Sequence, residues 1–275
     1  MKLLLVFSSP NGTTRTTANL LKKAFLPYGH EVEILDIGRS PWRENHADIL
    51  QEIRHAEVVG FGSPAYHMDF FQPLLSLFNH MAAQSEPFPI RAFFFLPFSG
   101  ITTGKAFLRA TRQFRRMQIP VIGAIKIQAP HFHHTQPFPT PETEHHIHTF
   151  VSELEIKKYA PIPWQMTEDQ FKPFTPKVHV IRPLIHWVGK LRELPITMEP
   201  ALCTRCGKCI RECPAGAIHK NGLVQIEASL CLHCYHCVAA CPKQAIHCPV
   251  EKLDAMMQRN IQIIGQEIPA NQYYV

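Results

Sequence analysis

The sequence predicts an α/β protein with a doubly wound, five-stranded parallel sheet, followed by a smaller α+β domain rich in cysteine. Apolar strand-like runs alternate with helical patterns over the first 160 residues, as in sheets covered by helices on both faces. Eight of the nine cysteines lie between residues 203 and 241. A proline-rich stretch separates the two regions. We therefore expect a first domain at 1–160, a linker at 161–198, a second domain at 199–250 and a C-terminal tail at 251–275.

Each of the five expected strands is a short apolar or alternating run that ends in turn residues. The run at 31–37 alternates, which is typical of a strand nearer an edge of the sheet. Helices are expected where apolar residues recur on one side, as Ala18, Leu21 and Phe25 do. The expected strands cover 2–7, 31–37, 57–62, 91–98 and 120–128, and the expected helices cover 14–27, 46–55, 70–81, 103–117 and 142–159. Within the linker, residues 184–194 are expected to form a short docking helix.

The beginning of the sequence predicts a cytoplasmic protein. The apolar run from Leu3 to Phe7 is shorter than the core of a signal peptide and stops at a Ser-Ser-Pro turn. No uncharged apolar stretch approaches the roughly 18 residues of a membrane span. In such a chain, clustered cysteines indicate metal or redox chemistry rather than disulfides.

The cysteines form two copies of one pattern, C-x2-C-x2-C-x3-C-P, at residues 203–214 and 231–242. Three thiolates at i, i+3 and i+6 on a tight loop can reach three corners of one iron–sulfur cube, while the fourth points toward a neighbouring cluster. Structural zinc is the alternative, but it usually draws on two separated C-x2-C pairs. The spacing therefore favours iron–sulfur clusters. Cys248 fits neither copy, and we expect a spare buried thiol there.

The two copies resemble a bacterial two-cluster ferredoxin. This resemblance implies two [4Fe–4S] clusters whose ligands cross between the copies. One cluster would take Cys203, Cys206, Cys209 and Cys241, and the other Cys231, Cys234, Cys237 and Cys213.

A hydroxyl-rich turn follows the first predicted strand, in LVFSSPNGTTRTTANLL at 5–21. The free N–H groups at a helix N-terminus bind phosphate, and Ser9, Asn11, Gly12, Thr13 and Thr14 add donors around it. The segment resembles the flavodoxin signature, which implies bound FMN and the strand order 2-1-3-4-5. It departs from that signature at Pro10, which has no N–H to donate. An ordinary helix N-cap is the alternative.

Other phosphate loops fit the sequence poorly. No G-x-G-x-x-G follows the first strand, and GITTGKA at 100–106 is too short between its glycines for a P-loop.

Two further loops should meet this turn, because ligands bind at the carboxyl ends of strands in doubly wound sheets. By the flavodoxin resemblance, they would bind the flavin ring, with Tyr66 as the stacking aromatic. The expected contacts are Pro64, Ala65, Tyr66 and His67 after the third strand and Ser99, Gly100, Ile101 and Thr102 after the fourth. The chain thus resembles a flavodoxin–ferredoxin fusion over 1–160 and 199–250, a family of anaerobic bacteria and archaea.

The favoured function is electron transfer between FMN and two [4Fe–4S] clusters, relaying electrons between redox partner proteins in anaerobic metabolism. One alternative is an iron–sulfur flavoenzyme that reduces a quinone or nitro compound over a ring pocket at Tyr66, His67 and Phe98. We rank it lower because no acid/base pair accompanies those loops. A second alternative is a ferredoxin with a docking scaffold that has lost FMN. The sequence leaves the donor, the acceptor and the oligomeric state open.

The formal charge of +6 does not indicate a nucleic-acid partner. Two oxidised clusters with eight thiolates lower the charge to about +2, and a flavin phosphate brings it to about zero. A basic helix at 104–117 has two interpretations, a solvated face or a docking surface for an acidic redox protein. The His-rich stretch at 131–148 is expected to be a solvated loop leading into a helix rather than a metal site.

Overall fold

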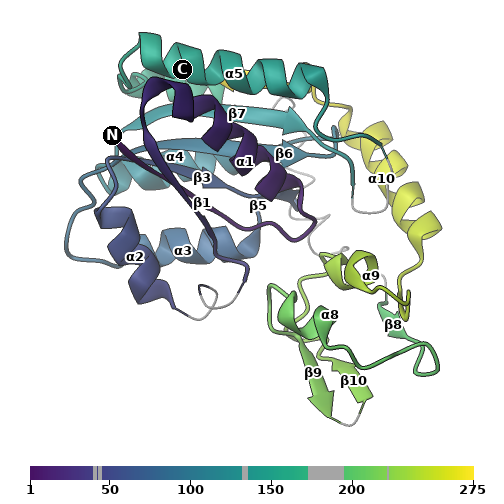
Figure 1. Ribbon diagram of the computed structural model, residues 1–275. Helices are drawn as coiled ribbons and strands as arrows, with labels where there is room; N and C mark the ends of the chain where they lie inside the picture. Colours follow the sequence, from purple (N-terminus) through teal and green to yellow (C-terminus); the bar gives the residue numbers. More distant parts are fainter. Residues whose placement is uncertain (40–41, 43–44, 132–135, 173–194, 222) are drawn as a thin grey trace.

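A computed structural model describes residues 1–39, 42, 45–131, 136–172, 195–221 and 223–275. Its main sheet has the order β12-β7-β6-β3-β1-β2 (Figure 1). The five strands predicted from the sequence pair in parallel and in the expected order, which confirms the fold class. Their bounds are β1 Lys2–Phe7, β2 Glu31–Asp36, β3 Val58–Gly62, β6 Arg91–Phe98 and β7 Val121–Gln128.

Helices cover both faces of this sheet, as predicted. Apolar residues of α1 and α5 share one core cluster, and those of α2, α3 and α4 share the other. The expected helix over 14–27 is divided, because Pro27 lies in a separate 3-10 turn, Leu26–Tyr28. The helices are α1 Thr13–Phe25, α2 His46–Arg54, α3 Gln72–Ala82, α4 Ala106–Arg116 and α5 Pro141–Ile156.

Three consecutive phenylalanines of β6 join the two cores. Phe94 packs in the α2–α4 core, whereas Phe93 and Phe95 pack in the α1–α5 core, and all three are fully buried. Room for Phe93 and Phe95 comes from glycines of β3: a Cβ on Gly60 would lie 2.4 Å from the ring of Phe93, and one on Gly62 would lie 2.1 Å from the ring of Phe95. Because the sheet is buried on both sides, only its strand ends and loops are available for a site.

The cysteine-rich region is a small unit with two antiparallel ribbons, β9–β10 and β8–β11. Its core is limited to residues such as Ile218, Val224 and Ile246, together with several cysteines. A core this small ordinarily needs a metal or disulfides for stability. The elements are α6 Trp164–Gln170 before it, then β8 Thr197–Met198, α8 Lys208–Arg211, β9 Ile218–Asn221, β10 Leu223–Ile226, α9 His236–Ala240 and β11 Ile246–His247.

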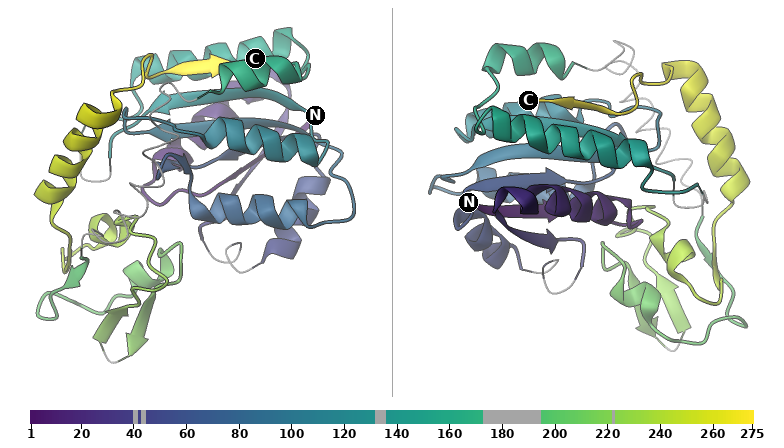
Figure 2. Two further views of the ribbon diagram at one scale, coloured as in Figure 1. Left: turned by 180° about the vertical axis from the view of Figure 1, so that it is seen from behind. Right: turned by 45° about the horizontal axis from the view of Figure 1, so that its top comes forward.

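Residues 251–275, for which the sequence predicts no element, lead back to the main sheet. Helix α10, Val250–Ile264, runs from the cysteine-rich unit toward it, and β12, Gln272–Tyr274, pairs antiparallel with β7 (Figure 2). The cysteine-rich unit is therefore inserted between α6 and β12. The docking helix expected at 184–194 lies outside the described residues. Within the described part of the chain, no helix has the length and apolarity needed to cross a bilayer.

Candidate metal centres and phosphate loop

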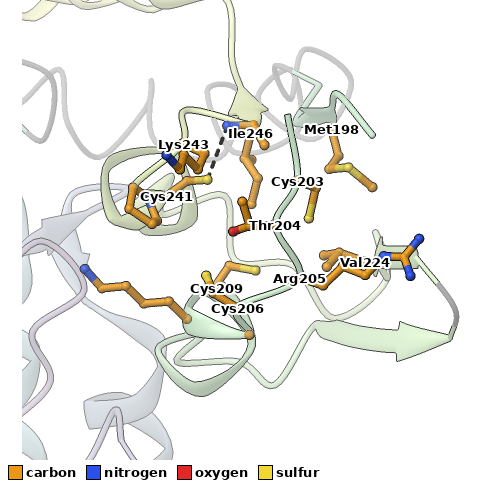
Figure 3. A pocket seen from close by; sticks show the side chains of 14 residues that line it. Met198, Cys203, Thr204, Arg205, Cys206, Cys209, Val224, Cys241, Lys243 and Ile246 are labelled. Atoms are coloured by element: carbon orange, nitrogen blue, oxygen red, sulfur yellow. Dashed lines mark hydrogen bonds between the residues drawn. The ribbon is translucent and has the colours of Figure 1, made fainter. Parts of the chain in front are cut away.

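One hollow in the cysteine-rich unit, of about 390 Å³ including space open to solvent, is lined by Cys203, Cys206, Cys209 and Cys241. Their sulfur atoms point into it (Figure 3). A second hollow, of about 340 Å³, is lined by Cys213, Cys231, Cys234 and Cys237. We call the first the outer pocket and the second the inner pocket. The structure thus brings the eight cysteines together in the two crossed sets of four that the ferredoxin resemblance implies.

The internal repeat is visible in the backbone as well as in the cysteines. Left-handed conformations occur at Arg205 and Gly207 in the first copy, and at His233 and Tyr235 in the second. These pairs are separated by 28 residues, the same offset as between Cys203 and Cys231. The left-handed residues turn each ligand loop tightly, so that three successive thiols can face one pocket.

Hydrogen bonds to sulfur repeat at the same offset. The N–H of Ala217 donates to Cys213 Sγ at 3.3 Å, and the N–H of Ala245 donates to Cys241 Sγ at 3.2 Å. Such bonds from the protein to ligand sulfurs tune the potential of an iron–sulfur centre.

The thiols of the inner pocket are poor acids on their own. Burial, together with the charges of neighbouring cysteines, raises the pKa values of Cys234 and Cys237 to about 12 each. In the exposed part of the outer pocket, the N–H of Lys208 holds the pKa of Cys206 below its ordinary value. Four thiolates can share the buried pocket only if a cationic metal centre compensates their charge.

The cysteines surround a hollow rather than a single point. Among the described His, Cys, Asp and Glu side chains, no three gather closely enough to hold one metal ion. Each hollow is lined by four cysteines, the ligand number of one [4Fe–4S] cluster.

The predicted phosphate loop joins β1 to α1 and contains unpaired buried groups. Gly12 is left-handed at the N-cap of α1, and Ser9 Oγ accepts a bond from the N–H of Arg15. Ser8 Oγ, Asn11 Oδ1 and Thr14 Oγ1 are buried and have no hydrogen-bond partner within the described residues. A buried polar group without a partner costs about 1–3 kcal/mol. Of these groups, the Ser8 and Thr14 hydroxyls can donate to a phosphate ester bound at the free N–H groups of α1, whereas Asn11 Oδ1 only accepts hydrogen bonds.

Sequence reasoning missed Ser8, which contributes one of these hydroxyls. The only available signal was its place in the Ser8-Ser9 pair before Pro10. Because side chains alternate along a strand, the two serines at its end point in different directions, and the sequence alone does not show which one faces the loop.

The first of the two expected ring-binding loops forms a short hairpin, β4 Ala65–Tyr66 with β5 Asp69–Phe70. The Tyr66 hydroxyl donates to the carbonyl oxygen of Cys234 at 3.2 Å and is also hydrogen-bonded by the side chain of Asn11. Burial raises the pKa of Tyr66 well above its ordinary value. Tyr66 therefore connects the phosphate loop to a cysteine loop of the inner pocket. Of its predicted neighbours, Pro64 is buried and His67 is exposed at the hairpin tip.

The second expected ring-binding loop contacts the C-terminal segment. Glu267 is buried and accepts bonds from Thr102 Oγ1 at 3.0 Å and from the N–H of Thr103 at 2.6 Å. Its own N–H donates to the carbonyl of Ile101, and Lys126 Nζ lies 2.6 Å from its carboxylate. Thr102, expected at the ring, is thus already bonded to Glu267. Ser99 and Gly100 lie in the same loop, where Gly100 is left-handed.

The basic helix α4 uses several of its charges within the molecule. Arg109 pairs with Asp69, Arg112 lies 2.6 Å from Glu168, and the Arg115 guanidinium stacks over Trp164 at 4.3 Å. The His-rich stretch leads into α5, as expected, and His146 of that helix contacts the ring of Tyr273. His133 and His134 lie outside the described residues.

Comparison with known proteins identifies a family in the cysteine-rich region. A family model described as a 4Fe-4S dicluster domain matches residues 201–246. No curated protein sequence matches the chain. The fold of the first unit follows from its strand order, 2-1-3-4-5, which is that of flavodoxin-like sheets.

Among solved structures, the first unit is similar in fold to three redox proteins. Oxidised flavodoxin 1 from Bacillus cereus is 16% identical, with 57% of this chain and 98% of that chain covered at a TM-score of 0.44. A flavodoxin from the domain Archaea is 15% identical, with 57% and 98% covered at 0.43. The rubredoxin oxygen:oxidoreductase of the anaerobe Desulfovibrio gigas is 17% identical, with 58% of this chain and 37% of that chain covered at 0.41. The match thus spans little more than a third of the Desulfovibrio protein.

Proposed function

We propose that this chain, a flavodoxin-like unit joined to a 4Fe-4S dicluster domain, relays electrons between FMN in the first unit and two [4Fe–4S] clusters in the second. FMN exchanges one or two electrons and each cluster exchanges one, so the chain would couple two-electron to one-electron redox partners. The observation that carries this proposal is the hydrogen bond from Tyr66 to Cys234, because it joins the hairpin after β3, one of the expected flavin-binding loops, to a cysteine loop of the inner pocket.

The protein's own residues have distinct parts in this proposal. The hydroxyls of Ser8 and Thr14 and the N-terminus of α1 would bind the phosphate of FMN. The eight cysteines would hold the clusters, four in each pocket. The N–H groups of Ala217 and Ala245 would tune the potentials through their bonds to sulfur. Tyr66 and Asn11 would fix the distance between the two units.

The decisive experiment is anaerobic reconstitution followed by counting of iron, sulfide and flavin. We expect about eight iron atoms per chain from the eight ligands of two clusters, together with one FMN. Reductive titration with EPR would then show cluster signals and flavin bleaching in one preparation. Iron in this amount with no flavin at any FMN concentration would contradict the proposal.

A second candidate, a ferredoxin with a docking scaffold that has lost FMN, is favoured by one observation. The side chain of Thr102, a residue of the second expected ring-binding loop, is bonded to Glu267. Titration of the apoprotein with FMN separates the two candidates, because binding quenches flavin fluorescence only if the site is functional.

The nine cysteines form no disulfide, which suits a reducing compartment, and we infer that the protein is located in the cytoplasm.

A further inference from the structure

The two cysteine pockets differ in their contact with the first unit. The inner pocket lies against it: Cys234 accepts the bond from Tyr66, and Pro214 lies beside Gly38, whose added Cβ would be 3.6 Å from Pro214 Cβ. Cys234 and Cys237 are each only 8% exposed. The other two cysteines of this pocket, Cys213 and Cys231, are partly buried.

The outer pocket opens to solvent and is ringed by cations. Cys206 is exposed, and so are its lining neighbours Arg205 and Lys243 (Figure 3). Lys208 lines the same pocket, and none of the described lining residues is acidic. The described lining of the inner pocket, by contrast, contains no charged residue other than its cysteines.

Within the described part of the chain, neither Arg205 nor Lys243 forms an ion pair, and Lys208 is attracted electrostatically to Glu212. Glu212, the carboxylate that follows α8, is bonded to His236 at 2.7 Å. In α4, Arg109, Arg112 and Arg115 already contact Asp69, Glu168 and Trp164. Arg205 and Lys243 at the outer rim are thus exposed and have no carboxylate partner among the described residues, whereas Arg109 and Arg112 of α4 each have one.

We propose that the rim formed by Arg205, Lys208 and Lys243 is the docking surface for an acidic one-electron redox protein, and that the inner pocket serves as the internal link to the flavodoxin-like unit. Both statements rest on the proposed function, since they need a cluster in each pocket. At each encounter one electron crosses the rim. The electron donor is oxidised by one electron and the acceptor is reduced by one electron. No bond forms or breaks, and no proton is transferred.

Two physical effects make this rim suitable. Exposed charges of one sign raise the rate of encounter with an oppositely charged partner, and salt weakens the effect within a Debye length of about 10 Å at 0.1 M. Exposure of Cys206 also lets the partner approach the centre closely. The described residues that line the inner pocket are buried or partly buried, and none of them is a lysine or an arginine.

The test uses reconstituted holoprotein carrying R205E, K208E and K243E together. The control carries K22E, K23E and K158E, which make the same charge change at the far end of the sheet. The probe for binding is a small acidic ferredoxin, titrated calorimetrically at low and high salt. The probes for electron transfer are two oxidants of similar size and opposite charge, the anion cobalt(III)–EDTA and the cation hexaamminecobalt(III), mixed with reduced protein in a stopped-flow instrument.

We expect the rim variant to bind the acidic ferredoxin at least about tenfold more weakly at low salt, with the difference shrinking at high salt. Oxidation by the anion should slow and oxidation by the cation should accelerate, while the control variant behaves as the wild type. Equal effects of the two variants, or none, would overturn the docking role. A wild type that holds no iron would instead refute the proposed function. If the charge reversals lower the iron content, the variant that carries R205Q, K208Q and K243Q together is tested in their place. Its affinity for the acidic ferredoxin and its two oxidation rates should change in the same directions by smaller amounts.

Discussion

Lys126 Nζ lies 2.6 Å from the Glu267 carboxylate, and both side chains are buried between β7 and the segment that leads into β12. The pair joins residues 141 positions apart. It fastens the C-terminal segment to the loop after β6, because the same carboxylate also accepts bonds from Thr102 and Thr103.

Replacing Glu267 by Gln should lower the free energy of unfolding by about 3 kcal/mol, since it leaves a buried ammonium without its counter-charge. Adding K126M should recover much of this loss, because the double variant buries no charge. Urea unfolding followed by circular dichroism measures both. If E267Q and the double variant were equally destabilised, the ion pair would not be the source of the effect.

Removing the two unpaired hydroxyls, with S8A and T14V, should weaken FMN binding by about tenfold while leaving the apoprotein as stable or slightly more stable. The two effects have opposite signs because each hydroxyl is unsatisfied until a ligand bonds to it. Fluorescence titration measures affinity, and thermal unfolding measures stability. N19A, an exposed position on the same helix, is the matched control. Unchanged FMN affinity in S8A/T14V would refute the phosphate site.

The variant Y66F keeps the ring packed on Phe71 but loses the hydroxyl bond to Cys234. We expect the free energy of the contact between the two units to become less favourable by about 1 kcal/mol. Hydrogen exchange should then increase in residues 62–71 and 231–237 together. Y28F, which alters an exposed tyrosine, should leave both regions unchanged. Faster exchange in only one of the two regions would show that the bond does not couple the units.

Serine substitutions test the crossed ligand sets. C241S should disturb the same cluster as C203S, whereas C213S should disturb the other, because the pockets group the cysteines in this way. Each variant should retain about four iron atoms in place of about eight, and the two classes should leave different EPR signals. C248S is the control, since Cys248 lines neither pocket. Matching residual signals in C241S and C213S would contradict the crossed arrangement.

Acid should loosen the C-terminal strand before it unfolds the sheet. Burial against β12 lowers the pKa of His146 below its ordinary value of 6.5. The unfolded form therefore binds the proton more readily, so this contribution to stability is present above pH 6.5 and falls as the pH decreases below it. Exchange of the β12 amides should rise in this range, and H146F should abolish the rise. A pH-independent exchange rate in the wild type would contradict this.

The sequence predicted the sheet well because its signals are local: apolar strands, amphipathic helices and a hydroxyl-rich turn. Three cysteines of each pocket are close in the sequence, but the fourth comes from the other copy, and that grouping was expected only from the ferredoxin resemblance. Glu267 was not, because its partners, Lys126 and Thr102, lie more than a hundred residues away and a lone glutamate near the C-terminus has no local signature. Tyr66 was singled out, but its bond to Cys234 depends on how the two units pack, which no sequence pattern encodes.

The insertion of the cysteine-rich unit between α6 and β12 has a mechanical consequence. A domain attached by one linker can reorient freely, whereas this unit is connected to the first unit at both of its ends. The C-terminal connection ends in β12, which pairs with the edge of the sheet. Double attachment keeps the two units at a high effective concentration even when the contacts between them break. Cleavage of either connection by a protease should therefore leave the two fragments associated.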